Sequence, residues 1–177
     1  NSVMKAPRAF SMDHAYWGPA FSNAEVRAAL DDAGANYELC ESDDKLINET
    51  AQRLAKGGVI GWFQGRMEFG PRALGSRSLL ADPRRADMKD IINAKVKFRE
   101  AFRPFAPAVL KERAHEFFEM PEGMDAPFML LVPSVRPEAR AQIPAVTHQD
   151  GTGRVQTVTP EHNPLYYGVI KRFGELT

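Results

Sequence analysis

The residues DDKLINETAQRLAKGGVIGWF (43–63) decide the fold class. Their first part predicts a helix, because Ser42 and the two aspartates after it favour a helix N-terminus and Gly57 and Gly58 end the apolar periodicity. The run VIGWF (59–63) is short and apolar, which is typical of a buried strand. A helix that leads directly into a buried strand indicates an α/β layer arrangement.

Similar segments lie on both sides of this stretch. Ser22 and Glu25 have the spacing of a capping box and predict a helix that ends at Gly34. The remaining predictions are strands at 78–82, 105–110, 127–132 and 154–158 and helices at 84–95, 111–119 and 164–173. A further strand usually follows the last helix of such a layer, so we expect the chain to stop before its domain does.

The composition excludes several classes of protein. The chain has 177 residues, of which 44% are hydrophobic and 26% charged, and this balance is typical of a soluble globular domain with one core. A single cysteine, Cys40, excludes an internal disulfide, and no apolar run approaches the ~20 residues of a membrane helix. The first residues lack the apolar core of a signal peptide, so we expect a cytoplasmic protein with no membrane partner. Position 1 is not a methionine, which favours a piece of a longer polypeptide.

The charge of the chain is unevenly distributed although its formal sum is zero. Residues 1–52 carry a net charge of −5, residues 53–113 carry +8 and residues 114–177 carry −3. Most cations of the middle third are arginines, whose planar side chains suit bidentate contact with phosphate or carboxylate groups. The pattern fits an anionic ligand, and it also fits a solvated basic face paired with the acidic flanks.

The stretch GRMEFGPRALGSRS (65–78) is the densest in candidate binding residues. Its three glycines and one proline punctuate a segment that contains Arg66, Arg72 and Arg77. A glycine-rich connection from a strand to a short helix beginning at Pro71 would bring backbone N–H groups close to a phosphate. The stretch matches neither a Walker A loop nor a GxGxxG pattern, so an anion cradle and a tight structural turn both fit it.

The stretch KVKFREAFRPFAP (95–107) holds a second group of cations. If 96–99 is extended, Lys97 and Arg99 project from one side, and Arg103 can join them on one anion. Three phenylalanines would then pack beneath the cations: Phe98, Phe102 and Phe105. The same phenylalanines would also form the buried stripe of a helix, with the cations in solvent. The prolines near the end of the stretch favour the extended version.

The stretch THQDGTGRVQT (147–157) leads through turn residues into a predicted strand. It brings four polar residues towards the beginning of the predicted strand: His148, Asp150, Arg154 and Gln156. A lone histidine is more often structural than catalytic, and two candidate ligands are too few for a metal site. The chain contains no GxSxG, HExxH or partnered Cys–His motif, so catalysis would depend on positioning and on the electrostatic stabilisation of phosphates.

Together these stretches resemble a known family. The matching segments are YWGPAFSNAEVRAAL (16–30), GWFQGRMEFGPRALGSRSLLADPR (61–84), INAKVKFREAFRPFAPAVL (92–110), PFMLLV (127–132) and IPAVTHQDGTGRVQTV (143–158). They are similar to the C-terminal region of the NodU/CmcH-type O-carbamoyltransferases. The resemblance implies a YrdC-like α/β fold, which is an open twisted mixed sheet with flanking helices.

The resemblance also implies a domain organisation. Residues 1–177 would form a single YrdC-like C-terminal domain, truncated before a strand that carries an Asn-Thr-Ser-Phe-Asn motif in the family. A Kae1-like N-terminal part, which carries a metal and the acceptor site in the family, would be a missing partner. Transfer of a carbamoyl group would need both parts.

The family's reaction defines the expected ligands. ATP, with Mg²⁺, and carbamoyl phosphate would form carbamoyl-adenylate, with release of phosphate and pyrophosphate, before transfer to a hydroxyl of a natural product or nodulation factor. The resemblance assigns seven residues to the binding of carbamoyl phosphate and ATP: Arg72, Arg77, Lys97, Arg99, Arg103, His148 and Arg154. The first two would line the cavity, the next three would hold the phosphates, and the last two would contact carbamoyl phosphate or the phosphate that forms. No residue is assigned as a general acid or base or as a metal ligand.

Two rival interpretations remain. A YrdC-like module that binds nucleic acid fits the basic patch and its interleaved phenylalanines. The zero net charge and the clustering of the basic residues around glycine turns argue against nucleic acid as a partner. A remnant that binds the ligands without turnover is the other rival.

Overall fold

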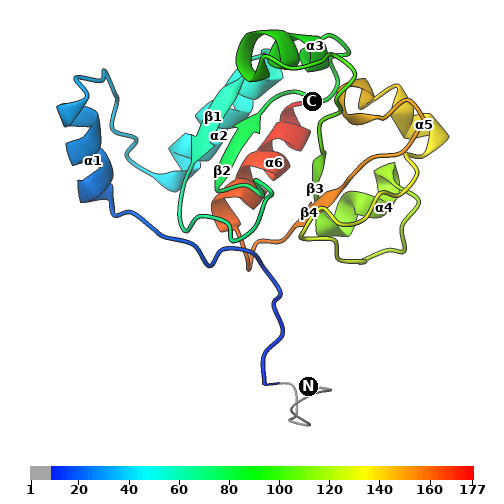
Figure 1. The fold of residues 1–177 in the computed structure, drawn as a ribbon, viewed down its shortest axis with the longest axis horizontal. Coiled ribbons are helices and arrows are strands. Elements are labelled where there is room, and N and C mark those ends of the chain that lie inside the picture. Colours follow the sequence, from blue (N-terminus) through cyan, green and yellow to red (C-terminus); the bar gives the residue numbers. More distant parts are fainter. Residues whose placement is uncertain (1–8) are drawn as a thin grey trace.

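The computed structural model describes residues 9–177. Helices and strands are interspersed along this part of the chain, as predicted for an α/β domain (Figure 1). The α-helices are α1 (Asn23–Asp32), α2 (Asp43–Ala55), α3 (Met88–Ile92), α4 (Ala114–Phe117), α5 (Pro137–Arg140) and α6 (Pro164–Leu176). The strands are β1 (Ile60–Phe63), β2 (Arg77–Leu80), β3 (Ala108–Leu110) and β4 (Gln156–Val158). A π-helical turn, η1 (Asn93–Lys97), and two 3-10 turns, η2 (Lys111–Arg113) and η3 (Pro144–Val146), complete the elements.

The three longest helices begin where the sequence predicts. The Ser22 side chain accepts the N–H of Glu25, and the Glu25 carboxylate accepts the N–H of Ser22, which confirms the capping box of α1. Ser42 caps α2 and Asn163 caps α6, each by accepting a backbone N–H three residues later. These bonds satisfy donors that have no partner inside the helix.

The strands form two separate sheets within the described residues. β1 and β2 are antiparallel, with Ile60 opposite Leu80, and β3 and β4 are parallel, with Ala108 opposite Gln156. The α/β class is therefore confirmed, whereas residues 9–177 form two two-stranded sheets in place of one open sheet. An apolar groove of about 690 Å³, lined by β2, β3 and α6, separates the two sheets.

One of the five predicted strands, at 127–132, is wrong. This segment is irregular, and Met129 has a left-handed backbone with φ of 52°. Pro127 and Pro133 bracket the segment and supply no backbone N–H to a ladder. Leu130 is 76% exposed, and Leu131 packs against the core while only partly buried, so this apolar run lies at the edge of the core. The other four predicted strands are confirmed with shorter bounds.

Two clusters of buried side chains form most of the core. In the first, α2 and α6 pack against each other and against β1, through residues such as Leu54, Trp62 and Val169. The second surrounds Phe118 and Val155. Helix α1 buries no residue and projects from the rest, at the left of Figure 1. None of the helices between residues 9 and 177 has the length and hydropathy that a bilayer crossing requires.

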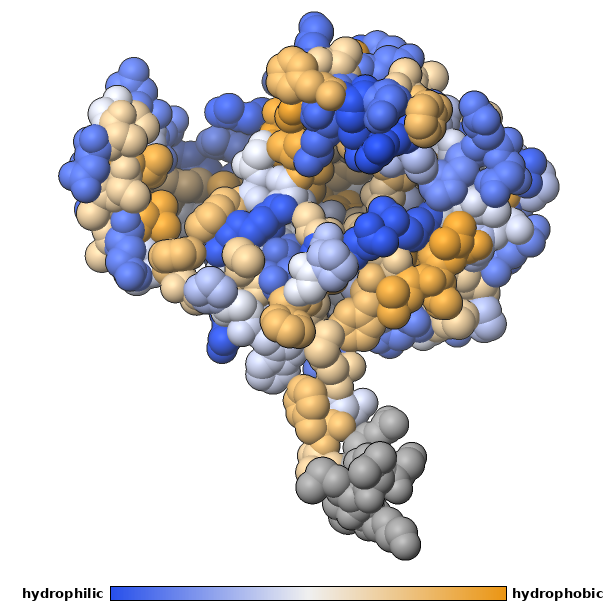
Figure 2. All heavy atoms as spheres, in the orientation of Figure 1, coloured by the Kyte–Doolittle hydropathy of each residue, from blue (hydrophilic) through white to orange (hydrophobic). Residues whose placement is uncertain are grey.

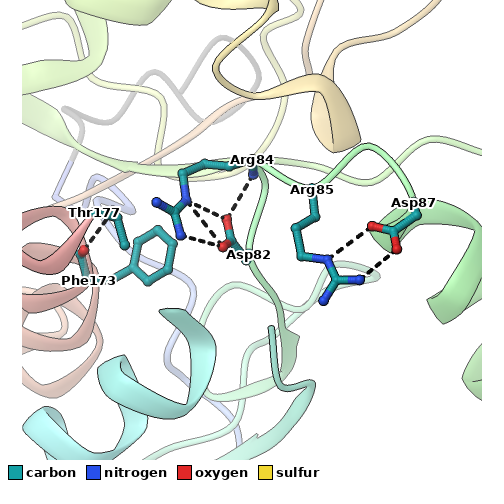
Figure 3. A network of polar contacts seen from close by, with 6 residues as sticks. All are labelled: Asp82, Arg84, Arg85, Asp87, Phe173 and Thr177. Atoms are coloured by element: carbon teal, nitrogen blue, oxygen red, sulfur yellow. Dashed lines mark hydrogen bonds and ion pairs between the residues drawn. The ribbon is translucent and has the colours of Figure 1, made fainter. Parts of the chain in front are cut away.

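A buried ion pair ties the end of β2 to α6 (Figure 3). Asp82, 2% exposed, accepts the backbone N–H of Arg84 at 2.9 Å and its Nε and Nη2 groups at 3.0 and 2.7 Å. The guanidinium of Arg84 lies 5.4 Å from the ring centroid of Phe173 in α6. Both oxygens of Asp82 are thereby satisfied, so this buried carboxylate stabilises the fold.

Candidate functional site

The glycine-rich stretch lies between β1 and β2, and its turn at 74–77 is held by the buried carboxylate of Glu68. Its Oε1 accepts the backbone N–H groups of Leu74, Ser76 and Arg77 at 2.6, 2.8 and 3.3 Å. Glu68 is only 5% exposed. These three backbone donors are therefore not available to a phosphate, and the structure favours a tight turn over an anion cradle at 74–77. The turn is preceded by irregular chain, so the short helix expected from Pro71 is absent there.

The carbonyls of the same turn are also taken. Five side chains donate to the carbonyls of Leu74 and Gly75 at 2.7–3.3 Å: Tyr16 and Gln156 to the first, and Trp62, Gln64 and Asn163 to the second. Gly75 has a φ of 103°, and a side chain at this position would overlap the ring of Tyr166. The turn is therefore fixed in one conformation that requires glycine.

Two of the three arginines in this loop brace it. Nη1 of Arg77 donates to the carbonyls of Gln64 and Ser76 at 2.8 and 2.9 Å. The guanidinium carbon of Arg77 lies 3.5 Å from the ring centroid of Phe63. Arg66 donates to two carbonyls of the N-terminal arm at 3.0 Å. Arg77 was expected to face a ligand, but its Nη1 and Nη2 groups donate to carbonyls at the ends of its own loop.

The segments of Arg72, the third arginine of the loop, and of Arg154, which precedes β4, are joined by a hydrogen bond. The amide of Gln156, two residues after Arg154, donates to the carbonyl of Leu74, two residues after Arg72, at 2.7 Å. Burial lowers the pKa of Arg154, and the positive charge of Arg72 lowers it further. Neither guanidinium forms an ion pair among residues 9–177. Like charges held together without a counter-charge repel, and a bound anion would relieve that repulsion. Arg72 and Arg154, called the arginine pair below, are therefore the best-defined candidate for an anion site.

His148 belongs to a chain of hydrogen bonds in the loop before β4. The Thr152 hydroxyl donates its one proton to Oδ1 of Asp150 at 2.7 Å, so it accepts from Nδ1 of His148 at 3.0 Å. Assigned from this network, the His148 ring carries a proton on Nδ1, and Nε2 is left without a hydrogen-bond partner among the described residues. The Thr152 hydroxyl and then its backbone N–H lower the pKa of Asp150.

The second group of cations has a geometry different from the one expected. Helix α3 continues as the π-helical turn η1 to Lys97, and Phe98 takes a left-handed conformation with φ of 48°. The prediction that 96–99 is extended is therefore wrong, because 96 and 97 belong to η1 and Phe98 is left-handed. The alternative helix with a buried phenylalanine stripe is wrong as well, because Phe98 and Phe102 are 84% and 70% exposed. Of the three phenylalanines, Phe105 alone packs against the core.

The buried side chain of Asn93 explains this geometry. Its Nδ2 donates to the carbonyl of Arg103 at 3.1 Å, and its Oδ1 accepts from Nε of Arg99 at 2.7 Å. The chain must fold back over Asn93 to make these bonds, which excludes an extended segment. Arg99 also lies 4.7 Å from the ring centroid of Phe105, and Arg103 pairs with Glu100 at 2.9 Å.

The cations of this segment converge only in part. Arg99 and Arg103 line one open hollow of about 490 Å³ together with Asn93 and Phe98, whereas Lys97 lies outside this lining. Figure 2 shows that this face of the molecule is hollowed near its centre and that hydrophilic side chains gather beside the hollow on the side of α3. The structure thus presents two groups of cations: the arginine pair, which comes from two loops, and Arg99 and Arg103, which come from the loop after η1.

Neither of the two buried residues that organise these loops was predicted. Glu68 is the one acidic residue between Gly65 and Ser78, in a stretch with three arginines, and this contrast could have indicated a buried charge. Nothing in the sequence around Asn93 distinguishes a buried amide from a solvated one. Among the described residues, no group of three or more His, Cys, Asp or Glu side chains is placed to hold a metal ion.

Known proteins match the chain across the residues of both loops. The family model of the carbamoyltransferase C-terminus matches residues 51–177. Nodulation protein NolO of Bradyrhizobium diazoefficiens is 48% identical over 92% of the chain, and nodulation protein NolNO of Sinorhizobium fredii is 50% identical over 97% of it. Nodulation protein U of Rhizobium tropici is 42% identical over 92% of the chain. The chain spans only 25–30% of the length of these relatives.

Proposed function

Because the chain belongs to the carbamoyltransferase C-terminal family, we propose that it binds carbamoyl phosphate and ATP and forms carbamoyl-adenylate. The arginine pair is the observation that carries this proposal. Two guanidinium groups without a counter-charge suit a phosphate group, and the resemblance of the surrounding sequence indicates which phosphates these are. The chain would then supply the activation step of a larger enzyme.

The proposed reaction releases both phosphate and pyrophosphate, so one water molecule must enter it. Water would split carbamoyl phosphate into carbamate and phosphate. A carbamate oxygen would then attack the α-phosphorus of ATP, with pyrophosphate as the leaving group. Negative charge develops on phosphate oxygens in both steps, and arginines that are already in place stabilise it without reorganisation.

Each group of cations would bind the phosphates of a different ligand. The arginine pair would hold the phosphate of carbamoyl phosphate, and Nε2 of His148 would contact the phosphate that forms. Arg99 and Arg103, at the open hollow, would hold the phosphates of ATP, with Lys97 close by on η1, and Arg77 would keep the loop of the arginine pair in shape. Any Mg²⁺ would arrive with the ATP phosphates, because the described residues contain no metal cluster, and no step is assigned to it.

Transfer of the carbamoyl group would take place elsewhere in a longer polypeptide. The resemblance implies a Kae1-like part that carries the acceptor site, for a hydroxyl of the nodulation-factor or natural-product type. We therefore assign residues 1–177 to one YrdC-like domain that depends on that part for transfer.

Calorimetric titration with carbamoyl phosphate and ATP tests this function. The chain should bind carbamoyl phosphate, and Arg154→Met should weaken the binding by about tenfold or more, since a charge-assisted contact contributes roughly 1.5–3 kcal/mol. Carbamoyl phosphate and ATP together should release pyrophosphate. Binding without release would leave a binding-only module, and the absence of binding would reject the proposal.

A nucleic-acid-binding module is the second candidate, favoured by the exposed rings of Phe98 and Phe102. Aromatic rings beside Lys97 and Arg103 can stack on unpaired bases. A single-stranded oligonucleotide should then bind more tightly than heparin at equal salt, and Phe98→Ala should remove the difference. Equal binding of the two polyanions would reject this candidate.

A further inference from the structure

Glu68 does more than fill a buried position. We propose that Glu68 is a positioning residue, which fixes the turn at 74–77 and thereby holds the segment of Arg72 against the segment of Arg154, to which Gln156 binds it. The ligand class, a phosphate-bearing anion, rests on the proposed function. The mechanism rests on the contacts of Glu68 itself.

The hydrogen bond from Leu74 to the carboxylate of Glu68 closes a short loop that contains Arg72. Glu68 lies four residues before Arg72, and Leu74, whose N–H it accepts at 2.6 Å, lies two residues after it. The segment between them cannot extend while this bond is made. Gly70, with φ of 119°, supplies the left-handed turn that lets the loop close. The position of the Arg72 backbone therefore depends on a bond made by Glu68.

The same oxygen also fixes the chain that follows. Oε1 accepts the N–H groups of Ser76 and Arg77 as well, so one atom organises three donors. These donors would otherwise face an incoming phosphate and compete with the arginine side chains for it. Glu68 thus directs anion binding from the backbone of the loop to its guanidinium groups.

Tyr16 fixes the same residue of the turn from the other side. Its hydroxyl donates to the carbonyl of Leu74 at 2.7 Å, while Glu68 accepts the N–H of Leu74. Burial raises the pKa of Tyr16, and the charge of Glu68 raises it further. Both backbone groups of Leu74 are therefore held by buried or half-buried side chains.

Asp82 provides a matched control inside the same molecule. It is another buried carboxylate, 2% exposed, and it also accepts a backbone N–H and guanidinium donors. Its partner is Arg84, which lines the apolar groove and whose side-chain hydrogen bonds within residues 9–177 all go to Asp82. Loss of either carboxylate should destabilise the fold, but only loss of Glu68 should disturb the arginine pair.

Inorganic phosphate is the probe, because the arginine pair is assigned the phosphate of carbamoyl phosphate. Glu68→Gln keeps the size of the side chain and one acceptor oxygen while it removes the charge. It should weaken phosphate binding by about tenfold or more, measured by calorimetry below the melting temperature of every variant. Hydrogen exchange at the amides of Leu74, Ser76 and Arg77 should accelerate. Glu68→Ala should weaken binding further, and if that variant does not fold, Glu68→Gln decides.

The outcomes separate this role from the proposed function. Unchanged phosphate affinity in Glu68→Gln, or an equal loss in Asp82→Asn, would overturn the positioning role. Phosphate binding that depends on Glu68, in a chain that releases no pyrophosphate from ATP, would overturn the proposed function and leave the positioning role intact. A parent chain that binds no phosphate would overturn both.

Discussion

The side-chain amide of Gln156 in β4 donates to the carbonyl of Leu74 at 2.7 Å, across 82 positions of sequence. Arg154 precedes Gln156 by two residues, and Arg72 precedes Leu74 by two. This hydrogen bond therefore links the two segments that carry the arginines. Because Gln156 is buried, this bond forms away from water, where its geometry matters most.

Gln156→Leu should separate the loops. Removal of the amide takes one donor from the carbonyl of Leu74, so the free energy of unfolding should fall by about 1–3 kcal/mol. Affinity for carbamoyl phosphate should fall too, although Gln156 is assigned no contact with the ligand. Urea unfolding and calorimetry measure the two effects. Gln142→Leu is the control, since Gln142 is exposed and bonded within its own turn; an unaltered affinity in Gln156→Leu would disprove the link.

Gly75→Ala should be among the most harmful small substitutions in the chain. Alanine at φ of 103° strains the backbone by about 1–3 kcal/mol, and its methyl group would overlap the ring of Tyr166. Gly70→Ala has a similar backbone penalty, at φ of 119°, but its methyl group would have no neighbouring atom within 4 Å. Thermal unfolding of both variants should therefore show the larger loss for Gly75→Ala. Equal losses would mean that the contact with Tyr166 is unimportant.

Phosphate should stabilise the parent chain more than Arg72→Met. A ligand that binds the folded state at about 100 times its dissociation constant stabilises it by roughly 2.7 kcal/mol. Arg72→Met removes one member of the arginine pair and with it the repulsion on Arg154, so its stability without phosphate should stay within about 0.5 kcal/mol of the parent. Melting temperatures in phosphate, with chloride at equal ionic strength as control, measure the difference. An identical phosphate response in both proteins would speak against the site.

Thr152→Val should raise the pKa of Asp150 towards its ordinary value. In the parent, bonds from Thr152 lower this pKa, so the folded state favours the ionised carboxylate. That contribution to stability is present above the ordinary aspartate pKa and is lost as pH falls through the lowered value. The stability difference between parent and Thr152→Val should therefore shrink across this acidic window. An NMR titration of the Asp150 carboxyl carbon measures the shift, and an unchanged pKa in the variant would contradict the hydrogen-bond network.

Local structure was largely predictable because its causes are local. The capping residues Ser22 and Ser42 start helices through donors three residues away, and apolar runs such as 59–63 become strands because they are buried. The loop after α3 was not predictable. Its course depends on Asn93, which bonds to the carbonyl of Arg103 ten residues later, and no periodic pattern reveals such a bond.

The candidate site was predictable in its residue types more than in their roles. Arg72 and Arg154 come from separate stretches, which a hydrogen bond from Gln156 to the carbonyl of Leu74 joins. Arg77 donates to its own loop, and Lys97 lies outside the hollow that Arg99 lines. A guanidinium carries five donors, and tertiary structure decides whether carbonyls or a ligand receive them. Sequence spacing cannot make that distinction.

A double-mutant cycle on the arginine pair tests most directly whether Arg72 and Arg154 bind one phosphate group together. The affinity for carbamoyl phosphate is measured in the parent chain, in Arg72→Met, in Arg154→Met and in the double variant. Each single change should weaken binding by about tenfold or more, and the double change should cost less than both together by a coupling of about 0.5–3 kcal/mol. Losses that simply multiply, or single variants that bind as well as the parent, would contradict a shared site.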